Sequence, residues 1–373
     1  MVHDVNDAYL LINPNGGRNR RNKGDLEDLI EEAKSLGCRY DKTEDLNDLE
    51  EKVEASVDRM DDLVIISSGD GGLGMAVTYY INAIKKRYRV DDKDAIAELL
   101  PKFLVLPGGT VNVVADNVGV KGNPAGVFSE IMETYRAEGV EGLNVKDRRI
   151  LEVQEGERQA KYGFMFAKGL VDNYLDKYYG QTEKQKKKKN YGLLRFGSIF
   201  ARAVGGYFAD VLSGWALPMS WRKAMFSCYH HCVTPEHLEL NVDGDPVLNY
   251  AVREGCSAST NEYLGAFVAT DYFKIFGMKP LHAFKDGNPD GKMQVLAGTS
   301  PIHKFVRHLP KVWTGEPLPF PKYVDEVANE VTFKPSPGER HRYSLDAELA
   351  KSMSETLYVR QGPMVKFATL PAK

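Results

Sequence analysis

The chain has 373 residues, of which 43% are hydrophobic and 27% are charged. This length and composition allow a sizeable core and favour two domains over one. A formal net charge of −3 gives no overall attraction to nucleic acid or anionic membranes, so we expect no nucleic-acid partner. The first residues lack a signal-peptide pattern, and four cysteines are too few for a disulfide framework. We therefore expect a cytoplasmic protein.

Short apolar runs alternate with helical patterns over the first 145 residues. Strands are expected at residues 9–12, 63–67 and 103–106, and helices near 25–36, 46–57, 73–88, 111 and 125. Strands that alternate with helices favour a parallel sheet covered on both faces. The pattern therefore predicts an α/β domain.

From residue 146 the sequence changes to short runs rich in aromatic and β-branched residues. They lie at residues 149–153, 162–166, 237–242, 292–297 and 330–334, separated by Gly, Pro, Asn and Asp. Such runs are typical of an antiparallel β domain. Residues 184–219 differ, because a basic run at 184–189 precedes an amphipathic pattern with Phe, Tyr and Trp that would suit a membrane surface. The alternative is a solvated lysine loop followed by a core helix.

Three glycine turns in the first domain each follow an apolar strand and precede a helix. They are residues 13–18 (NPNGGR), 69–72 (GDGG) and 107–112 (PGGTVN). The carboxyl ends of parallel strands lie at one edge of a sheet, and glycine lets backbone N–H groups approach a phosphate there. The sequence therefore predicts a phosphate-binding edge. Its candidate residues are Asn13, Gly16, Gly17, Arg18, Ser68, Gly69, Gly71, Gly72, Gly109, Thr110 and Asn112.

Asp70, within the second turn, decides between two kinds of phosphate site. Residues 69–74 fit the G-x-G-x-x-G pattern of a dinucleotide-binding turn, but a carboxylate would oppose a pyrophosphate. The acidic residue required about 20 positions later would be Asp91 or Asp92, which lie in a polar stretch and not at a strand end. Phosphoryl transfer from ATP accommodates the acid, because a carboxylate can hold Mg²⁺ or accept the proton of the attacking hydroxyl. Asp70 could do either.

Taken together, these motifs resemble those of the diacylglycerol kinase catalytic-domain family, which includes bacterial lipid kinases, sphingosine kinases and ceramide kinases. The family carries N-P-x-S/G-G, S-G-D-G and P-x-G-T/S-x-N in the order and spacing found at residues 13–17, 68–71 and 107–112. Its late D-G-E motif is similar to residues 346–348 (DAE), and its D-G turn is similar to residues 288–293. Gly72, Met75 and Val113 depart from the usual Thr, Glu and Asp.

The resemblance implies an N-terminal α/β domain with a parallel sheet, like that of NAD kinases and phosphofructokinases, and a C-terminal antiparallel β-sandwich. The first, nucleotide-binding, domain would comprise residues 1–145 with 355–373 returning to it, and the lipid-substrate domain residues 146–354. The implied reaction transfers the γ-phosphoryl group of ATP, with Mg²⁺, to a hydroxyl of diacylglycerol, a sphingoid base or ceramide at a membrane surface. Residues 194–197 and 217–218 resemble sphingosine and ceramide kinases and favour the sphingoid substrates. The protein would then be peripherally membrane-associated.

The resemblance also assigns the acidic residues. Asp70, Asp346 and Glu348 are the catalytic candidates, with either Asp70 or the later pair as general base. Asp70 and Asp290 are the metal candidates. Family members are often dimers, so a homodimer is a further expected partner.

Two other functions stay open. An NAD kinase-like enzyme shares the G-D-G turn, but Asn261-Glu262 and Asn329-Glu330 lie in the second domain, where they would not serve a nucleoside site. A catalytically weak lipid- or nucleotide-binding protein of the same fold would fit the three departures. Separately, residues 228–237 contain two cysteines and three histidines, but no second pair at zinc-site spacing. We expect a strand with buried cysteines there.

Overall fold

The structure, a computed structural model, divides into two compact units. Unit 1 comprises Met1–Ile150, Lys161–Phe164 and Gly362–Lys373, and unit 2 comprises Leu151–Ala160 and Met165–Gln361. The structure describes residues 7–370 except 111, 181–191, 214–215, 233–235, 247–261, 264, 271–273, 275–278, 280–282, 285–287, 289–290, 299–301, 318–322, 336–341 and 352–355.

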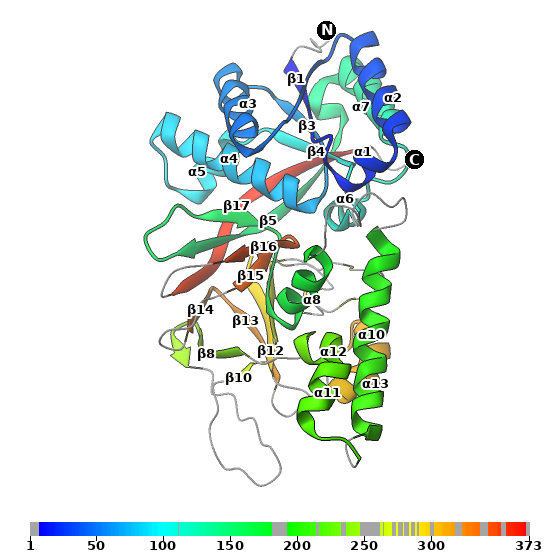
Figure 1. The fold of residues 1–373 in the computed structure, drawn as a ribbon. Helices are drawn as coiled ribbons and strands as arrows, with labels where there is room; N and C mark the ends of the chain where they lie inside the picture. Colours follow the sequence, from blue (N-terminus) through cyan, green and yellow to red (C-terminus); the bar gives the residue numbers. More distant parts are fainter. Residues whose placement is uncertain are drawn as a thin grey trace. The chain divides into compact units, whose positions relative to one another are not determined.

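Unit 1 is built on a parallel sheet with strand order β17-β4-β3-β1-β2. Helices α3 and α4 pack together on one side of it, and α2 and α7 pack together on the other (Figure 1). The elements are β1 (Ala8–Ile12), α1 (Gly17–Arg21), α2 (Lys23–Ser35), β2 (Arg39–Lys42), α3 (Leu46–Arg59), β3 (Leu63–Ser68), α4 (Asp70–Tyr88), α5 (Lys93–Leu99), β4 (Lys102–Pro107), α6 (Val113–Val118), α7 (Pro124–Glu138), a 3-10 turn (Gly139–Gly142) and β6 (Lys161–Gly163). Strands β5 (Asn144–Glu155) and β17 (Leu357–Thr369) have residues in both units.

The central strands of this sheet are apolar because helices cover both faces. Every residue of β1 and β3 is buried. The three glycine turns follow β1, β3 and β4, as predicted, and therefore lie at the carboxyl edge of the sheet. Helix α4 begins at Asp70, earlier than predicted, so Asp70 belongs to the first helical turn and not to a loop.

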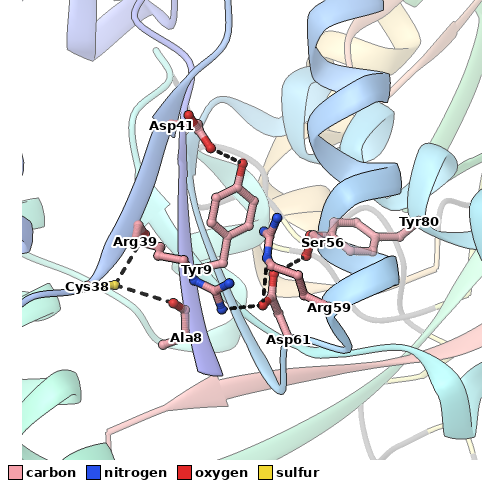
Figure 2. Close-up of polar contacts among 9 residues, drawn as sticks. All are labelled: Ala8, Tyr9, Cys38, Arg39, Asp41, Ser56, Arg59, Asp61 and Tyr80. Atoms are coloured by element: carbon pink, nitrogen blue, oxygen red, sulfur yellow. Dashed lines mark hydrogen bonds and ion pairs between the residues drawn. The ribbon is translucent and has the colours of Figure 1, made fainter. Parts of the chain in front are cut away.

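A polar cluster holds the opposite, amino edge of the sheet together (Figure 2). Its centre is Asp61, whose side chain is only 1% exposed. The carboxylate accepts hydrogen bonds from Ser56 Oγ at 2.7 Å, Arg39 Nη2 at 2.7 Å and Arg59 Nη2 at 2.9 Å. The Arg59 guanidinium lies 4.9 Å from the centre of the Tyr9 ring. These contacts tie α3 to β1, β2 and the start of β3.

Unit 2 combines two antiparallel sheets around one core. One has the order β10-β8-β14-β17 and the other the order β13-β12-β11-β7-β15-β16. Phe166 and Phe333, one from each sheet, meet with ring centres 5.1 Å apart. The elements are β7 (Met165–Gly169), α8 (Leu170–Tyr179), α10 (Gly192–Ser213), α11 (Met219–Met225), α12 (Ser227–Cys232), β8 (Glu236–Val242), β9 (Asp245–Pro246), β10 (Glu262–Tyr263), β11 (Gly265–Ala269), β12 (Met293–Gly298), α13 (Ile302–Thr314), β13 (Tyr323–Ala328), β14 (Glu330–Pro335), β15 (Arg342–Leu345) and β16 (Glu348–Lys351).

The predicted fold class, an N-terminal α/β domain with a parallel sheet and a C-terminal antiparallel β-sandwich, is confirmed. Within the described residues, no helix combines the length and the apolar character needed to cross a membrane.

Candidate functional site

The three glycine turns of unit 1 pack directly on one another. The Gly108 N–H donates to the Ser68 carbonyl at 3.1 Å, and the Arg18 N–H donates to the Gly108 carbonyl at 2.9 Å. A Cβ on Gly109 would lie 2.4 Å from Gly69 Cα, and a Cβ on Gly16 would lie 2.7 Å from the Gly108 carbonyl oxygen. Glycine is therefore required here because the backbones touch. The predicted residues of the three turns come together.

Asn19, which was not identified from the sequence as a site residue, forms hydrogen bonds to all three turns or to the strand ends that precede them. It is 4% exposed, and its Nδ2 lies 2.8 Å from the Asn13 carbonyl oxygen and 3.1 Å from the Ser67 carbonyl oxygen. Its backbone N–H donates to the Gly108 carbonyl at 3.2 Å. Asn19 thus contacts the residues at the ends of β1, β3 and β4. The only sequence feature that could have indicated this role is a short polar side chain close to the glycine pair Gly16-Gly17.

The third turn is closed by its own asparagine. Asn112 adopts a left-handed backbone with φ of 55°, a conformation that Asn tolerates better than most residues. Its Oδ1 accepts a hydrogen bond from the Gly109 N–H at 2.7 Å. The Thr110 hydroxyl lies where a Cβ on Gly17 would be, at 2.1 Å, so the first and third turns interlock at this pair.

Gly72, one of the departures from the family, is explained by its neighbour Ser68. A Cβ at position 72 would lie 2.0 Å from Ser68 Oγ and 3.3 Å from Asn13 Nδ2. The Ser68 hydroxyl in turn accepts a hydrogen bond from Asn13 Nδ2 at 3.4 Å. The space of the usual threonine side chain is therefore occupied by a serine hydroxyl.

Asp70 joins the second turn to the third. Its two carboxylate oxygens accept hydrogen bonds from the backbone N–H groups of Val113 and Val114, each at 2.9 Å. Desolvation raises the pKa of Asp70, and the charge of Asp116 adds to this, whereas the two backbone hydrogen bonds oppose it. Val113, a second departure, thus contributes its backbone to the site. Asp70 can order the third turn, and a carboxylate with a raised pKa is also a stronger base.

Arg18, a predicted phosphate-binding residue, is engaged elsewhere. Its guanidinium forms an ion pair with Asp25 at 3.1 Å and donates to the Gly122 carbonyl at 3.2 Å. Arg21, three residues later, lies with Nη1 3.5 Å from Thr110 Oγ1. The arginine that faces the third turn is therefore one that the sequence did not single out.

A cavity of about 260 Å³ adjoins the first two turns. Leu11, Leu49, Ile66 and Ala76 give it apolar walls. Asn13, Asn15, Thr43, Glu44, Ser68 and Gly72 supply polar atoms or backbone. It lies over the carboxyl ends of β2, β1 and β3.

Asp346 and Glu348 belong to a tight hairpin in unit 2. Asp346 and Ala347 form the two-residue turn between β15 and β16, with φ of 52° and 66°. Asp346 is 2% exposed, and its Oδ1 accepts a hydrogen bond from the Met165 N–H at 2.9 Å, whereas Glu348 is exposed. The Tyr179 hydroxyl donates to the Ala347 carbonyl at 3.2 Å. Asp290, the other metal candidate, lies outside the described residues.

The prediction of a strand around Cys228 is wrong. Residues Ser227–Cys232 form helix α12, with Cys232 buried against Ile199 and Ala203 of α10. His231 lies 3.1 Å from Asp176 of α8, and His230 lies 3.2 Å from Asp210 of α10. The histidines thus hold helices together. No group of three or more His, Cys, Asp or Glu side chains placed to hold a metal occurs in the described part of the chain.

A second cavity of about 670 Å³ lies among the helices of unit 2 and is open to solvent. Its walls come from α8, α10, α11 and α12 and include Lys177, Arg202, Ile199 and Phe226. Nearby helix surfaces carry exposed apolar side chains: Phe200, Phe208 and Leu212 on α10, and Met219, Trp221 and Met225 on α11. The basic run at 184–189 lies outside the described residues.

Residues 7–139 match the family model described as Diacylglycerol kinase catalytic domain. The resemblance predicted from the three turns is thereby confirmed. A comparison with curated proteins found no match.

Solved structures similar to the whole chain come from Bacillus anthracis str. Sterne. One, provisionally described as a diacylglycerol kinase, is 14% identical with a TM-score of 0.59 and covers 98% of this chain and 95% of its own. A second with the same description is 15% identical with a TM-score of 0.58, covering 97% and 96%. A third, described as a diacylglycerol kinase, is 12% identical with a TM-score of 0.53, covering 98% and 97%. At these identities the likeness concerns the fold alone.

Proposed function

We propose that the protein is an ATP-dependent lipid kinase that transfers the γ-phosphoryl group to a hydroxyl of a membrane lipid: diacylglycerol, a sphingoid base or ceramide. The observation that carries the proposal is the set of three interlocked glycine turns in a segment that matches the diacylglycerol kinase catalytic-domain family. In this proposal unit 1 binds the nucleotide and unit 2 binds the lipid.

The residues of unit 1 fit ATP. The cavity of about 260 Å³ offers apolar walls for a base and polar atoms for a ribose. The glycines of the adjoining turns let their backbones pack on one another, which brings the ends of three strands together beside the cavity. ATP supplies the phosphoryl group; the protein holds and orients it.

Mg²⁺ belongs to the proposal as a companion of the nucleotide. This ion usually keeps several waters and binds through phosphates with only one or two protein carboxylates. Such a site needs no three-ligand cluster, and the described residues contain none. Asp70, beside the turns, is the carboxylate that unit 1 would offer.

We assign the proton acceptor to Asp70 as well, with Asp346 and Glu348 as the rival pair. Burial raises the pKa of Asp70, which makes it a stronger base than an ordinary aspartate. Backbone hydrogen bonds hold both Asp70 and Asp346, and desolvation raises the pKa of Glu348 as well, so what favours Asp70 is its position beside the glycine turns. Asp70→Asn should therefore abolish phosphoryl transfer.

The lipid side of the proposal rests on unit 2. The cavity of about 670 Å³ has apolar side chains, such as Ile199 and Phe226, that could contact a lipid chain, together with the charged Asp176, Lys177 and Arg202. The exposed apolar side chains of α10 and α11 are suited to the bilayer interface, so we propose peripheral membrane association. A homodimer stays a prediction.

The decisive experiment incubates the purified protein with labelled ATP, Mg²⁺ and mixed micelles of diacylglycerol, sphingosine or ceramide, with NAD in parallel. Label in a lipid supports the kinase, and label only in NAD would instead show an NAD kinase. Binding of nucleotide or lipid without phosphoryl transfer would favour a catalytically weak binding protein. The departures from the family motif at Gly72 and Met75 would be consistent with that outcome. No label in any acceptor sinks the kinase proposal.

A further inference from the structure

We propose that Arg21 binds the terminal phosphoryl group of the nucleotide, and that Arg18, the more obvious arginine of the first turn, does not. This inference rests on the proposed nucleotide site and concerns the orientation of the nucleotide in it, with the nucleoside in the cavity and the terminal phosphate at Arg21. It follows from the contacts of the arginines of α1 and from the order of strands along the sheet edge.

Three arginines crowd into α1, whose five residues include no acid. Arg20 is exposed, and Arg18 is held by Asp25 and the Gly122 carbonyl. Arg21 is partly buried, and the described part of the chain offers its guanidinium no ion pair. Its hydrogen bond runs to Thr110 Oγ1 at 3.5 Å. A positive charge without a carboxylate is thus directed at the third turn.

The surroundings of Thr110 place this guanidinium beside a turn built from closely packed backbone. The Thr110 hydroxyl sits over Gly17, where a Cβ would lie 2.1 Å away. The Gly109 and Gly69 backbones touch on the other side of the turn. A planar guanidinium can donate to two phosphate oxygens at once, so Arg21 beside this turn is suited to hold a phosphoryl group.

The strand order shows which phosphate reaches Arg21. Along the carboxyl edge the order is β2, β1, β3, β4. The nucleoside-sized cavity lies over the ends of β2, β1 and β3, whereas Thr110 follows β4. Neighbouring strands are about 4.8 Å apart, so the middle of the cavity and the third turn are separated by roughly 10 Å. A nucleoside in the cavity therefore extends its phosphate chain towards Arg21, and the last phosphate meets it.

The test measures binding of adenosine, AMP, ADP and a non-hydrolysable ATP analogue, each with Mg²⁺, by titration calorimetry on the full chain. In Arg21→Ala we expect affinity for the ATP analogue to fall at least about tenfold, the usual effect of losing a charge-assisted hydrogen bond, while adenosine and AMP bind as before. Arg21→Lys should retain part of the affinity. Arg20→Ala, on the same helix but exposed, is the matched control and should change nothing.

Each outcome decides the matter. Equal weakening of AMP and the ATP analogue, or no weakening of either, would overturn the assignment of Arg21 while leaving the nucleotide site intact. A phosphate-dependent loss in Arg18→Ala instead would transfer the role to Arg18. If the unsubstituted protein binds none of the four ligands, both this inference and the proposed function fail. If it binds them but phosphorylates no lipid, only the proposed function fails. Thermal unfolding of each variant confirms that it is folded.

Discussion

The carboxylate of Asp70 accepts a hydrogen bond from the backbone N–H of Val114 at 2.9 Å, although 44 positions separate them in the sequence. The first N–H groups of a helix have no partner inside the helix, and here a side chain from another helix supplies it for α6. Asp70, the residue that the sequence identifies as a catalytic candidate, therefore holds the second and third glycine turns in a fixed relative position.

The raised pKa of Asp70 gives a pH-dependent stability. The ordinary value is 3.8, and burial raises the pKa in the folded protein. Folding therefore takes up a proton between 3.8 and the raised value. The stabilisation that this proton uptake gives the folded protein is fully present below pH 3.8 and is lost as the pH rises through the pKa of Asp70 in the folded state. The free energy of unfolding of the unsubstituted protein, relative to Asp70→Asn, should fall with rising pH in that window.

Urea unfolding at several pH values measures this difference. Asp62→Asn, at an exposed position, is the control and should follow the unsubstituted protein. A difference that stays flat across the window would contradict the prediction.

Restoring the usual threonine should harm this protein. In Gly72→Thr the new Cβ would collide with Ser68 Oγ, which must rotate and give up its contact with Asn13, so we expect a loss of about 1–2 kcal/mol of stability. Adding Ser68→Gly, which removes the colliding hydroxyl, should recover most of the loss. Gly24→Thr, at a helix position with open space, is the matched control. The explanation fails if the single and double variants are equally stable.

Ala347 is predicted to be a strained residue that glycine would relieve. Its φ of 66° is unfavourable for a residue with a Cβ, by roughly 1–2 kcal/mol. Ala347→Gly should therefore raise the free energy of unfolding by about 1 kcal/mol once the extra chain entropy of glycine is counted. Ala350→Gly, in the adjacent strand β16, should lower it by a similar amount. Thermal or urea unfolding that shows the same sign for both variants would refute the strain.

The cluster around Asp61 should be a major source of stability. Replacing its carboxylate leaves Arg39 and Arg59 facing each other without a buried counter-charge, so Asp61→Asn should cost about 3 kcal/mol. Asp58→Asn removes an exposed ion pair with Arg87 and should cost less than about 1 kcal/mol. Nucleotide binding at low temperature should survive in both, because the cluster lies at the edge opposite the turns. Similar losses in the two variants would contradict this.

Membrane association should depend on the exposed side chains of α10. Phe208 and Leu212 are 52% and 73% exposed, and burial of such groups in a bilayer interface is favourable by over a kcal/mol each. The double variant Phe208→Ser and Leu212→Ser should therefore reduce co-sedimentation with phosphatidylserine vesicles at least about tenfold. Met60→Ser, at an equally exposed apolar residue of unit 1, should not. Unchanged binding of the double variant would place the membrane contact elsewhere.

The sequence by itself determined the fold class of each domain, the order of the three glycine turns and the resemblance to the diacylglycerol kinase catalytic-domain family. It could do so because strand and helix patterns are local, and because strand ends in a parallel sheet share an edge whatever their distances. It did not determine that Ser68 occupies the place of a missing threonine, that Asn19 joins all three turns, or that Arg21 and not Arg18 faces Thr110. The sequence also predicted a strand at residues 227–232, because a short run of Cys, Tyr and His has no clear hydrophobic period. Packing against α10 selects the helix α12 instead. Some of these contacts join residues tens of positions apart, such as Arg21 and Thr110, and others depend on where a side chain near in sequence is placed by the fold, so only the tertiary structure decided them.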